Sequence, residues 1–216
     1  MIDQTTTQQP GSGDAGTDGE DWNLRQRVAD SVRRLMEVLV TSSPGKDQLE
    51  ELATMVDEYT ERFAVSRRAY GRDGFPGGLS GIGNIIHEFN ALSGRGNPAA
   101  PPVDIVLEGN EAHGKVRMGW QYEGPPGCVH GGLVAALLDE CLGIAQVPAG
   151  RPGMTGTLEV RYLSPTPVDA ELDLRARVDR VEGRKTLVSG EIRAGETVTA
   201  TCKGTFIQPR GYAGNE

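Results

Sequence analysis

Apolar side chains recur at steps of three and four along two segments near the start of the chain, and this spacing predicts two amphipathic helices. The first segment carries Leu24, Val28, Val32, Leu35 and Leu39, and the second carries Leu49, Leu52, Val56, Tyr59 and Phe63. The helix-breaking run Ser42-Ser43-Pro44-Gly45 separates them. We therefore expect residues 22–70 to form a helical hairpin extension.

The segments around these helices have a different composition. Residues 1–21 carry five acidic side chains and no basic one, and they are rich in Thr, Gln and Gly. Such a segment cannot bury enough apolar area to offset its ordering entropy, so we expect a disordered tail. Residues 71–102 are dense in Gly, Pro, Asn and Ser and are expected to form a connecting arm, and residues 209–216 a C-terminal tail.

From Val103 onwards apolar and polar residues alternate with a period of two, which is typical of half-buried antiparallel strands. The inward-facing positions are expected to be Val103, Ile105 and Leu107; then Gly114, Val116, Met118 and Trp120; then Leu172, Leu174, Ala176 and Val178; and finally Val198, Ala200, Cys202, Gly204 and Phe206. Turns are predicted at Gly109-Asn110, at residues 181–185 and at Gly195-Glu196.

One segment inside this β region has the pattern of a helix. Residues 133–145 are apolar on nearly every side of a helical wheel, and a helix of that kind must be surrounded. Two strands, one enclosed helix and three or four long strands predict an α+β domain over residues 103–208. Its architecture would be a curved antiparallel sheet wrapped around a central helix.

Composition excludes several classes of function. The formal net charge is −8 and the isoelectric point is near 5.0, so the surface repels phosphate backbones and no nucleic-acid partner is expected. The sequence has no run of about 18–20 apolar residues and its first residues do not resemble a secretory signal, so we expect a cytoplasmic protein without a membrane span. The histidines are scattered and the cysteines form no CxxC pair, so neither a metal site nor a bound cofactor is predicted.

Two features near the central helix could carry chemistry. Asp139 and Glu140 interrupt its apolar surface, and a buried carboxylate is costly unless something compensates it. Alternatively, both point outward through a narrow exposed strip. Gly131 and Gly132 follow His130 where the helix begins, and the first N–H groups of a helix can donate to an oxyanion. The two glycines could equally serve only a tight turn.

The run YEGPPGCVHGGLVAALLDECLG, Tyr122 to Gly143, resembles the signature of hotdog-fold acyl-CoA thioesterases. It is most similar to the phenylacetate-type branch and to the carboxy-terminal-modulator-type branch. The shared features are a Gly-Pro-Pro-Gly approach, a His-Gly-Gly at the helix start and an Asp nine residues after the His, here His130 and Asp139. The resemblance covers about residues 103–208. It implies hydrolysis of an acyl-CoA substrate without a cofactor, by a homodimer or a dimer of dimers.

The resemblance also implies roles for single residues. Asp139 would act as general base on water or as nucleophile, and the backbone N–H of Gly131 would donate to the oxyanion. His130 would help to orient the thioester, and Thr155 would supply an orienting hydroxyl. Each active site would combine Asp139 of one subunit with the Gly131 end of the other subunit's helix.

The sequence departs from the family pattern at one position. Many phenylacetate-type members have an Asn six residues before the His, whereas this chain has Gly124. Thr155 and Gln121 are the possible substitutes for that amide. Arg184 and Lys185 follow the long alternating strand, as a basic pair does in modulator-type relatives, and would meet the CoA phosphates; the alternative is a solvated hairpin turn.

Two other classes of function are compatible with the fold. The first is a non-hydrolytic acyl-CoA-binding regulator that carries a helical DNA-binding segment. Residues 22–70 hold eight Lys or Arg and eight Asp or Glu, so no basic recognition face is apparent. The second is a hotdog hydratase or dehydratase, which would use a differently spaced Asp and His. The helical extension could be a lid, an interface or simple packing.

Overall fold

The computed structural model describes residues 22–66, 88–109, 111–147 and 153–210. Its elements are α1 (Trp22–Thr41), α2 (Lys46–Ala64), β1 (Asp104–Glu108), β2 (Glu111–Arg117), the short 3₁₀ helix η3 (Trp120–Tyr122), α4 (Gly131–Ala145), β3 (Met154–Tyr162), β4 (Glu171–Glu182), β5 (Lys185–Ala194) and β6 (Thr197–Ile207). The expected α+β architecture with an N-terminal helical extension is confirmed. The expected tail at 1–21 lies outside the described residues, as do most of the arm at 71–102 and residues 211–216.

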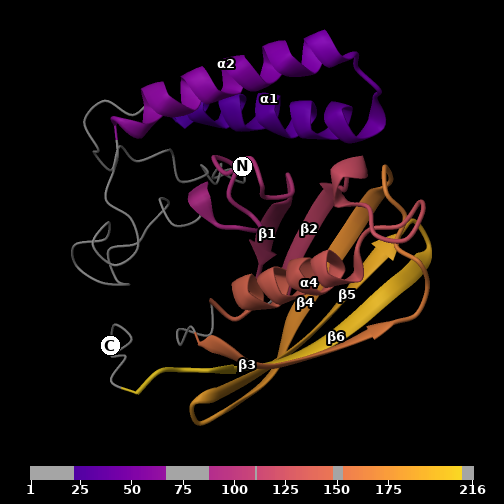
Figure 1. The fold of residues 1–216 in the computed structure, drawn as a ribbon. Coiled ribbons are helices and arrows are strands. Elements are labelled where there is room, and N and C mark those ends of the chain that lie inside the picture. The colour runs from indigo at the N-terminus through magenta and orange to yellow at the C-terminus, as the bar shows by residue number, and fades with distance from the viewer. Residues whose placement is uncertain (1–21, 67–87, 110, 148–152, 211–216) are drawn as a thin grey trace, which may run out of the picture.

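The six strands form one sheet in the order β1-β2-β4-β5-β6-β3, and every neighbouring pair is antiparallel. Figure 1 shows the sheet curving around α4, which lies across its inner face. The chain crosses from α4 to β3 at one edge of the sheet and then returns through β4, β5 and β6. Among the residues that the structure describes, the outer edge of β3 therefore has no strand beside it.

The helix α4 lies unusually close to the middle of the sheet because two glycines make room for one leucine. A Cβ atom at Gly190 of β5 would lie 2.7 Å from Leu142 of α4, and one at Gly204 of β6 would lie 2.8 Å from it. Neither distance is tolerable for real atoms. The core side of α4 is completely buried by this arrangement, through Val134, Leu137, Leu138, Cys141, Leu142 and Ala145.

The opposite side of α4 is only half-buried. Leu133, Ala135, Ala136 and Asp139 lie there, and no strand of the described part of the chain covers them. The sequence predicts a helix enclosed on every side, but the described residues supply a sheet on one side only. Within these residues the remaining apolar side is therefore left open.

The N-terminal helices are present but do not pack as closely as the expected hairpin implies. α1 buries Ala29 and Arg33, whereas α2 buries none of its residues. None of the helices in the described part of the chain is long and apolar enough to cross a membrane.

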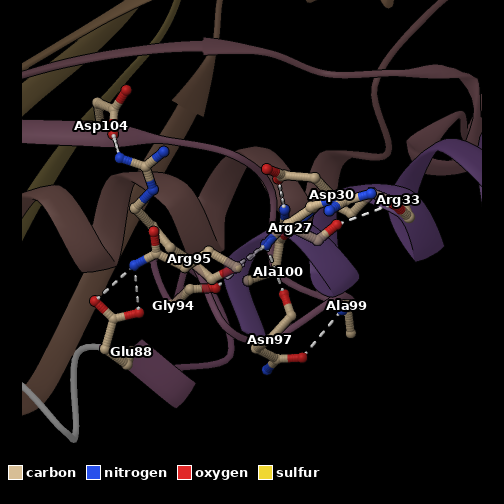
Figure 2. Close-up of polar contacts among 12 residues, drawn as sticks. Arg27, Asp30, Arg33, Glu88, Gly94, Arg95, Asn97, Ala99, Ala100 and Asp104 are labelled. Carbon is tan, nitrogen blue, oxygen red and sulfur yellow. Dashed lines mark hydrogen bonds and ion pairs between the residues drawn. The ribbon is translucent and has the colours of Figure 1, made fainter. Parts of the chain in front are cut away.

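Arg33 fastens α1 to the rest of the domain (Figure 2). The residue is 6% exposed, and its Nε donates to the carbonyl of Ala100 at 2.8 Å. Its Nη2 donates to the carbonyls of Arg95 and Asn97 at 2.8 and 2.9 Å, and its Nη1 pairs with Asp30 at 2.5 Å. One guanidinium thus satisfies several backbone acceptors of the loop that leads into β1.

We expect Arg33→Met to lower the free energy of unfolding by about 2–4 kcal/mol. Hydrogen bonds from a charged donor contribute about 1.5–3 kcal/mol each, and some of the freed carbonyls would regain water. Chemical denaturation measures the change. Arg34→Met is the matched control, because Arg34 is exposed and such a surface change is worth about 0.5 kcal/mol or less. Equal losses in the two variants would contradict the role given to Arg33.

Candidate active site

The first turn of α4 leaves one backbone donor free. The Nδ1 atom of His130 accepts from the N–H of Gly132 at 3.0 Å, so His130 caps the helix with its own side chain. The N–H groups of Leu133 and Val134 donate to the carbonyl of His130 at 2.9 and 3.2 Å. Among the described residues no acceptor is recorded for the N–H of Gly131. A single unpaired N–H therefore points out of the helix start.

The turn before the helix explains the glycine at position 124. The N–H of Gly124 donates to the carbonyl of Cys128 at 2.8 Å, and the N–H of His130 donates to the carbonyl of Tyr122 at 2.9 Å. This closes the loop so tightly that a Cβ atom at Gly124 would lie 2.7 Å from the Cα atom of His130. An asparagine side chain has no room at this position.

Gln121 does not face the helix start in place of that asparagine. Its side-chain oxygen is buried and lies next to Gly119, where a Cβ atom would be 2.5 Å from it. The carboxylate of Glu37 in α1 lies against the same glycine, 3.0 Å from that Cβ position. Gln121 therefore belongs to the contact between η3 and α1.

The two carboxylates of α4 have different partners. Thr155, at the start of β3, donates its hydroxyl to Oδ1 of Asp139 at 2.9 Å. Glu140 accepts from Ser93 at 2.5 Å and from the amide of Asn90 at 3.4 Å. Glu140 therefore anchors the loop that Arg33 also holds. Asp139 has a hydroxyl beside it and no ion pair within the described ranges.

These groups form two separate half-sites within one chain. Asp139 is eight positions after Gly131 in α4, a distance of about 12 Å along the helix at 1.5 Å per residue. The Gly131 end comprises the free N–H and His130, and the Asp139 end comprises the carboxylate and Thr155. One carbonyl group cannot contact both ends of the same helix.

Tyr162 is a site residue that the sequence reasoning missed. Its hydroxyl donates to the carbonyl of Gly131 at 2.8 Å, so β3 touches both half-sites. Simple alternation would put Thr155 and Tyr162 on opposite faces of β3, since they are seven positions apart. A register shift between Thr155 and Thr157 restores them to the same face. Periodicity alone does not reveal such a bulge.

The predicted basic pair lies at the Asp139 end of the sheet. Thr186 pairs with Phe206, which pairs with Thr155, so the turn before β5 is two strands from Thr155, or about 10 Å. Arg184 donates to the carbonyl of Gln208 at 2.7 and 2.9 Å. Lys185 is exposed, and no ion pair is recorded for it in the described part of the chain.

The groups available for chemistry at this candidate site are the carboxylate of Asp139 and the backbone N–H of Gly131. Burial raises the pKa of the Cys141 and Cys202 thiols to about 12, so neither provides a thiolate near neutral pH. Within the ranges that the structure describes, no group of three His, Cys, Asp or Glu side chains could hold a metal ion. Such a site is suited to attack on an activated carbonyl group.

Comparison with known proteins identifies relatives of this chain. A family model described as the thioesterase superfamily matches residues 126–201. Acyl-coenzyme A thioesterase THEM4 of Xenopus laevis is 38% identical over 72 residues, which are 33% of this chain and 32% of that protein. Human acyl-coenzyme A thioesterase THEM5 is 35% identical over 88 residues, 40% of this chain and 36% of its own length. The chain thus spans about a third of the length of these curated relatives.

One solved structure matches most of the chain. It is the crystal structure of protein RHA08564, a thioesterase superfamily protein, with a TM-score of 0.74 and 30% identity. The match covers 88% of this chain and 92% of that one. A relative this similar over nearly its full length shows the family, and the chain belongs to the thioesterase superfamily.

Proposed function

We propose that this protein hydrolyses an acyl-CoA thioester to the free acid and CoA. The observation that carries the proposal is Asp139, a half-buried carboxylate on an apolar helix that is oriented by the Thr155 hydroxyl and neutralised by no cation of the described chain. Such a group is available to move a proton or to attack a carbonyl carbon. The acyl-coenzyme A thioesterase names of the THEM4 and THEM5 relatives support the same substrate class.

The proposed reaction uses the two half-sites together. Asp139 takes a proton from water, and the water oxygen bonds to the thioester carbon. The carbonyl oxygen then carries the negative charge and accepts a hydrogen bond from the N–H of Gly131. When the tetrahedral species collapses, the C–S bond breaks and the leaving thiolate takes the proton from Asp139. Direct attack by Asp139 would need the same ionised carboxylate and the same N–H donor.

We propose further that the active protein is a homodimer formed through β3. The outer edge of this strand is unpaired within the described ranges, and exposed strand edges are normally covered. Met154 is 65% exposed and Tyr162 is 56% exposed, and both lie at the ends of this strand. A second copy would also cover the open side of α4.

Antiparallel pairing of two β3 edges around a two-fold axis would join the half-sites. It would set the Thr155 end of one strand beside the Tyr162 end of the other. Asp139 of one chain would then face Gly131 of the partner subunit, which removes the separation of about 12 Å along one helix. Each dimer would hold two such composite sites. Two dimers could assemble further into a dimer of dimers.

We propose that the turn before β5 binds the CoA phosphates, with Lys185 as the main contact. Lys185 is exposed and lies at the Asp139 end of the sheet. Arg184 is already bonded to the carbonyl of Gln208, so its part would be to hold the turn in place.

Asp139→Asn should lower the turnover number for acyl-CoA by at least about 100-fold, because it removes the group that moves the proton. Binding of a non-hydrolysable acyl-CoA analogue should persist. Glu140→Gln is the matched control, one position along the same helix. It should lower stability, because Glu140 holds Ser93, but leave turnover near normal. A folded Asp139→Asn protein with near-normal turnover would refute the proposed function.

Gly131→Pro should remove the proposed oxyanion donor while keeping the helix. Proline is well tolerated at the first helical position, and His130 has the extended backbone that a residue before proline needs, with φ −57° and ψ 128°. Loss of one such donor costs about 100- to 1,000-fold in turnover. Circular dichroism would verify that α4 survives.

Co-expression of Asp139→Asn and Gly131→Pro chains tests whether each site spans two subunits. Half of the dimers would be mixed, and each mixed dimer would hold one intact site. Activity should therefore recover to roughly a quarter of the wild-type value if sites are shared across a two-fold axis. No recovery in purified mixed dimers would contradict the shared site.

Lys185→Ala should raise the Michaelis constant for acyl-CoA by about fivefold at low salt, equivalent to about 1 kcal/mol for one exposed charge pair. The difference should shrink at moderate salt because exposed charges are screened. Lys203→Ala removes a similarly exposed lysine from the face of the sheet that is turned away from α4, and should change nothing. Equal Michaelis constants for wild type and Lys185→Ala at both salt concentrations would exclude this phosphate contact.

A further inference from the structure

The helix α2 has no partner within the described chain. It is 19 residues long and buries none of them. Its apolar residues remain largely in solvent, with Leu49 45%, Val56 47%, Tyr59 47% and Phe63 66% exposed. Isolated helices of this length are marginal in water, and most helices in proteins are stabilised by packing of an apolar face. We therefore expect the exposed apolar face of α2 to pack against another surface.

The spacing of these residues indicates what kind of cover fits. Leu49, Leu52, Val56, Tyr59 and Phe63 follow one another at alternating steps of three and four. This is the pattern of a helix that packs side by side with other helices, knobs into holes. We call these five residues the α2 seam.

A second apolar surface runs along α1. Its residues are Leu24, Val28, Val32, Leu35 and Leu39, which we call the α1 stripe. Val28 and Val32 line a shallow groove, and Leu39 is 40% exposed. Because Arg33 fixes the other side of α1 to the loop before β1, the α1 stripe is held in a defined place relative to the domain.

The charges beside the two surfaces select between possible partners. At about 100° per residue, the six carboxylates of α2 all fall on the half of the helix opposite the α2 seam. Helices that bind anionic lipid or nucleic acid carry Lys and Arg on the polar face instead. The acidic polar half of α2 therefore disfavours anionic lipid and nucleic acid as partners. Another protein helix is the partner that fits the α2 seam.

The two helices of this chain have complementary charges. α1 carries four arginines against two carboxylates, and α2 carries six carboxylates against two basic residues. Arg27 lines the same groove as Val28 and Val32 of the α1 stripe, whereas Arg34 and Asp57 lie further round their helices, outside the two apolar surfaces. No ion pair is recorded for any of these three side chains within the described ranges. A second copy of the same chain supplies both the helical partner and the opposite charges.

We propose that the α2 seam and the α1 stripe bind the α1 and α2 helices of a second copy of this chain, so that two extensions form a four-helix bundle. Such an interface is self-complementary about a two-fold axis. Figure 1 shows α1 and α2 on the β1–β2 side of the molecule, whereas β3 forms the opposite edge of the sheet. The bundle is therefore separate from the β3 edge and forms whether or not two β3 edges pair. If they do, the two interfaces together build a dimer of dimers.

Val56→Glu tests the bundle by placing a charge in the centre of the α2 seam. Sedimentation velocity should show the mass of the wild-type assembly halved, while turnover of acyl-CoA per chain stays unchanged. Thr54→Glu is the matched control, since it introduces the same side chain on the exposed opposite half of the same helix. It should leave the mass unchanged. A Val56→Glu protein with wild-type mass, or a control that dissociates equally, would overturn the proposal.

Hydrogen exchange separates a second copy from a cover supplied by the same chain. The amide protection of residues 46–64 in the intact wild-type protein should rise with protein concentration, and this rise should be absent in Val56→Glu. Protection that is high and independent of concentration would mean that the same chain covers α2, and would overturn the proposal. Absence of protection at every concentration would overturn it as well.

Discussion

The placement of Leu142 between Gly190 and Gly204 sets the distance between α4 and the sheet, and the rest of the structure depends on that distance. Any side chain at either glycine would occupy the space of the leucine. Because no space is left between α4 and the sheet, the core side of α4 is fully buried. The rotation of α4 about its own axis is therefore fixed. That rotation turns Asp139 toward β3, where Thr155 reaches it. The geometry of the candidate site is therefore a consequence of core packing on the other side of the same helix.

Adjacent carboxylates on α4 serve different parts of the molecule. Glu140 holds the loop through Ser93, the same loop whose carbonyls surround Arg33 of α1. The helical extension is thus linked to the central helix through this loop, which Arg33 holds on one side and Glu140 on the other. Asp139 takes no part in this linkage. Asp139 is therefore available for chemistry. The sequence alone could not distinguish it from Glu140, because both acids interrupt the same apolar surface.

Sequence patterns predicted those elements of the fold that depend on residues close together in the chain. Alternation gave β1, β2, β4 and β6, steps of three and four gave α1 and α2, and the motif gave the start of α4, because each depends on neighbouring residues. Trp120, expected as the last inward position of a strand, lies instead in η3 and is 39% exposed. Arg33 escaped prediction because its acceptors lie more than 60 positions away in the chain. Tyr162 escaped because a bulge in β3 breaks the period of two. The replacement of a family asparagine by Gly124 became understandable only when the closed turn against His130 was seen.

The apolar pattern of this sequence predicts more buried surface than the described part of one chain contains. Within the described residues, α4 is apolar nearly all round, yet the sheet covers one side of it; the outer edge of β3 is unpaired; and the apolar seam of α2 is exposed. The proposed dimer through β3 would cover the first two of these surfaces, and the proposed helical bundle would cover the third. An excess of patterned apolar surface over intramolecular partners is how a sequence encodes assembly. In this chain, assembly through β3 would also complete the reaction site, because a single helix keeps its N–H donor and its carboxylate about 12 Å apart.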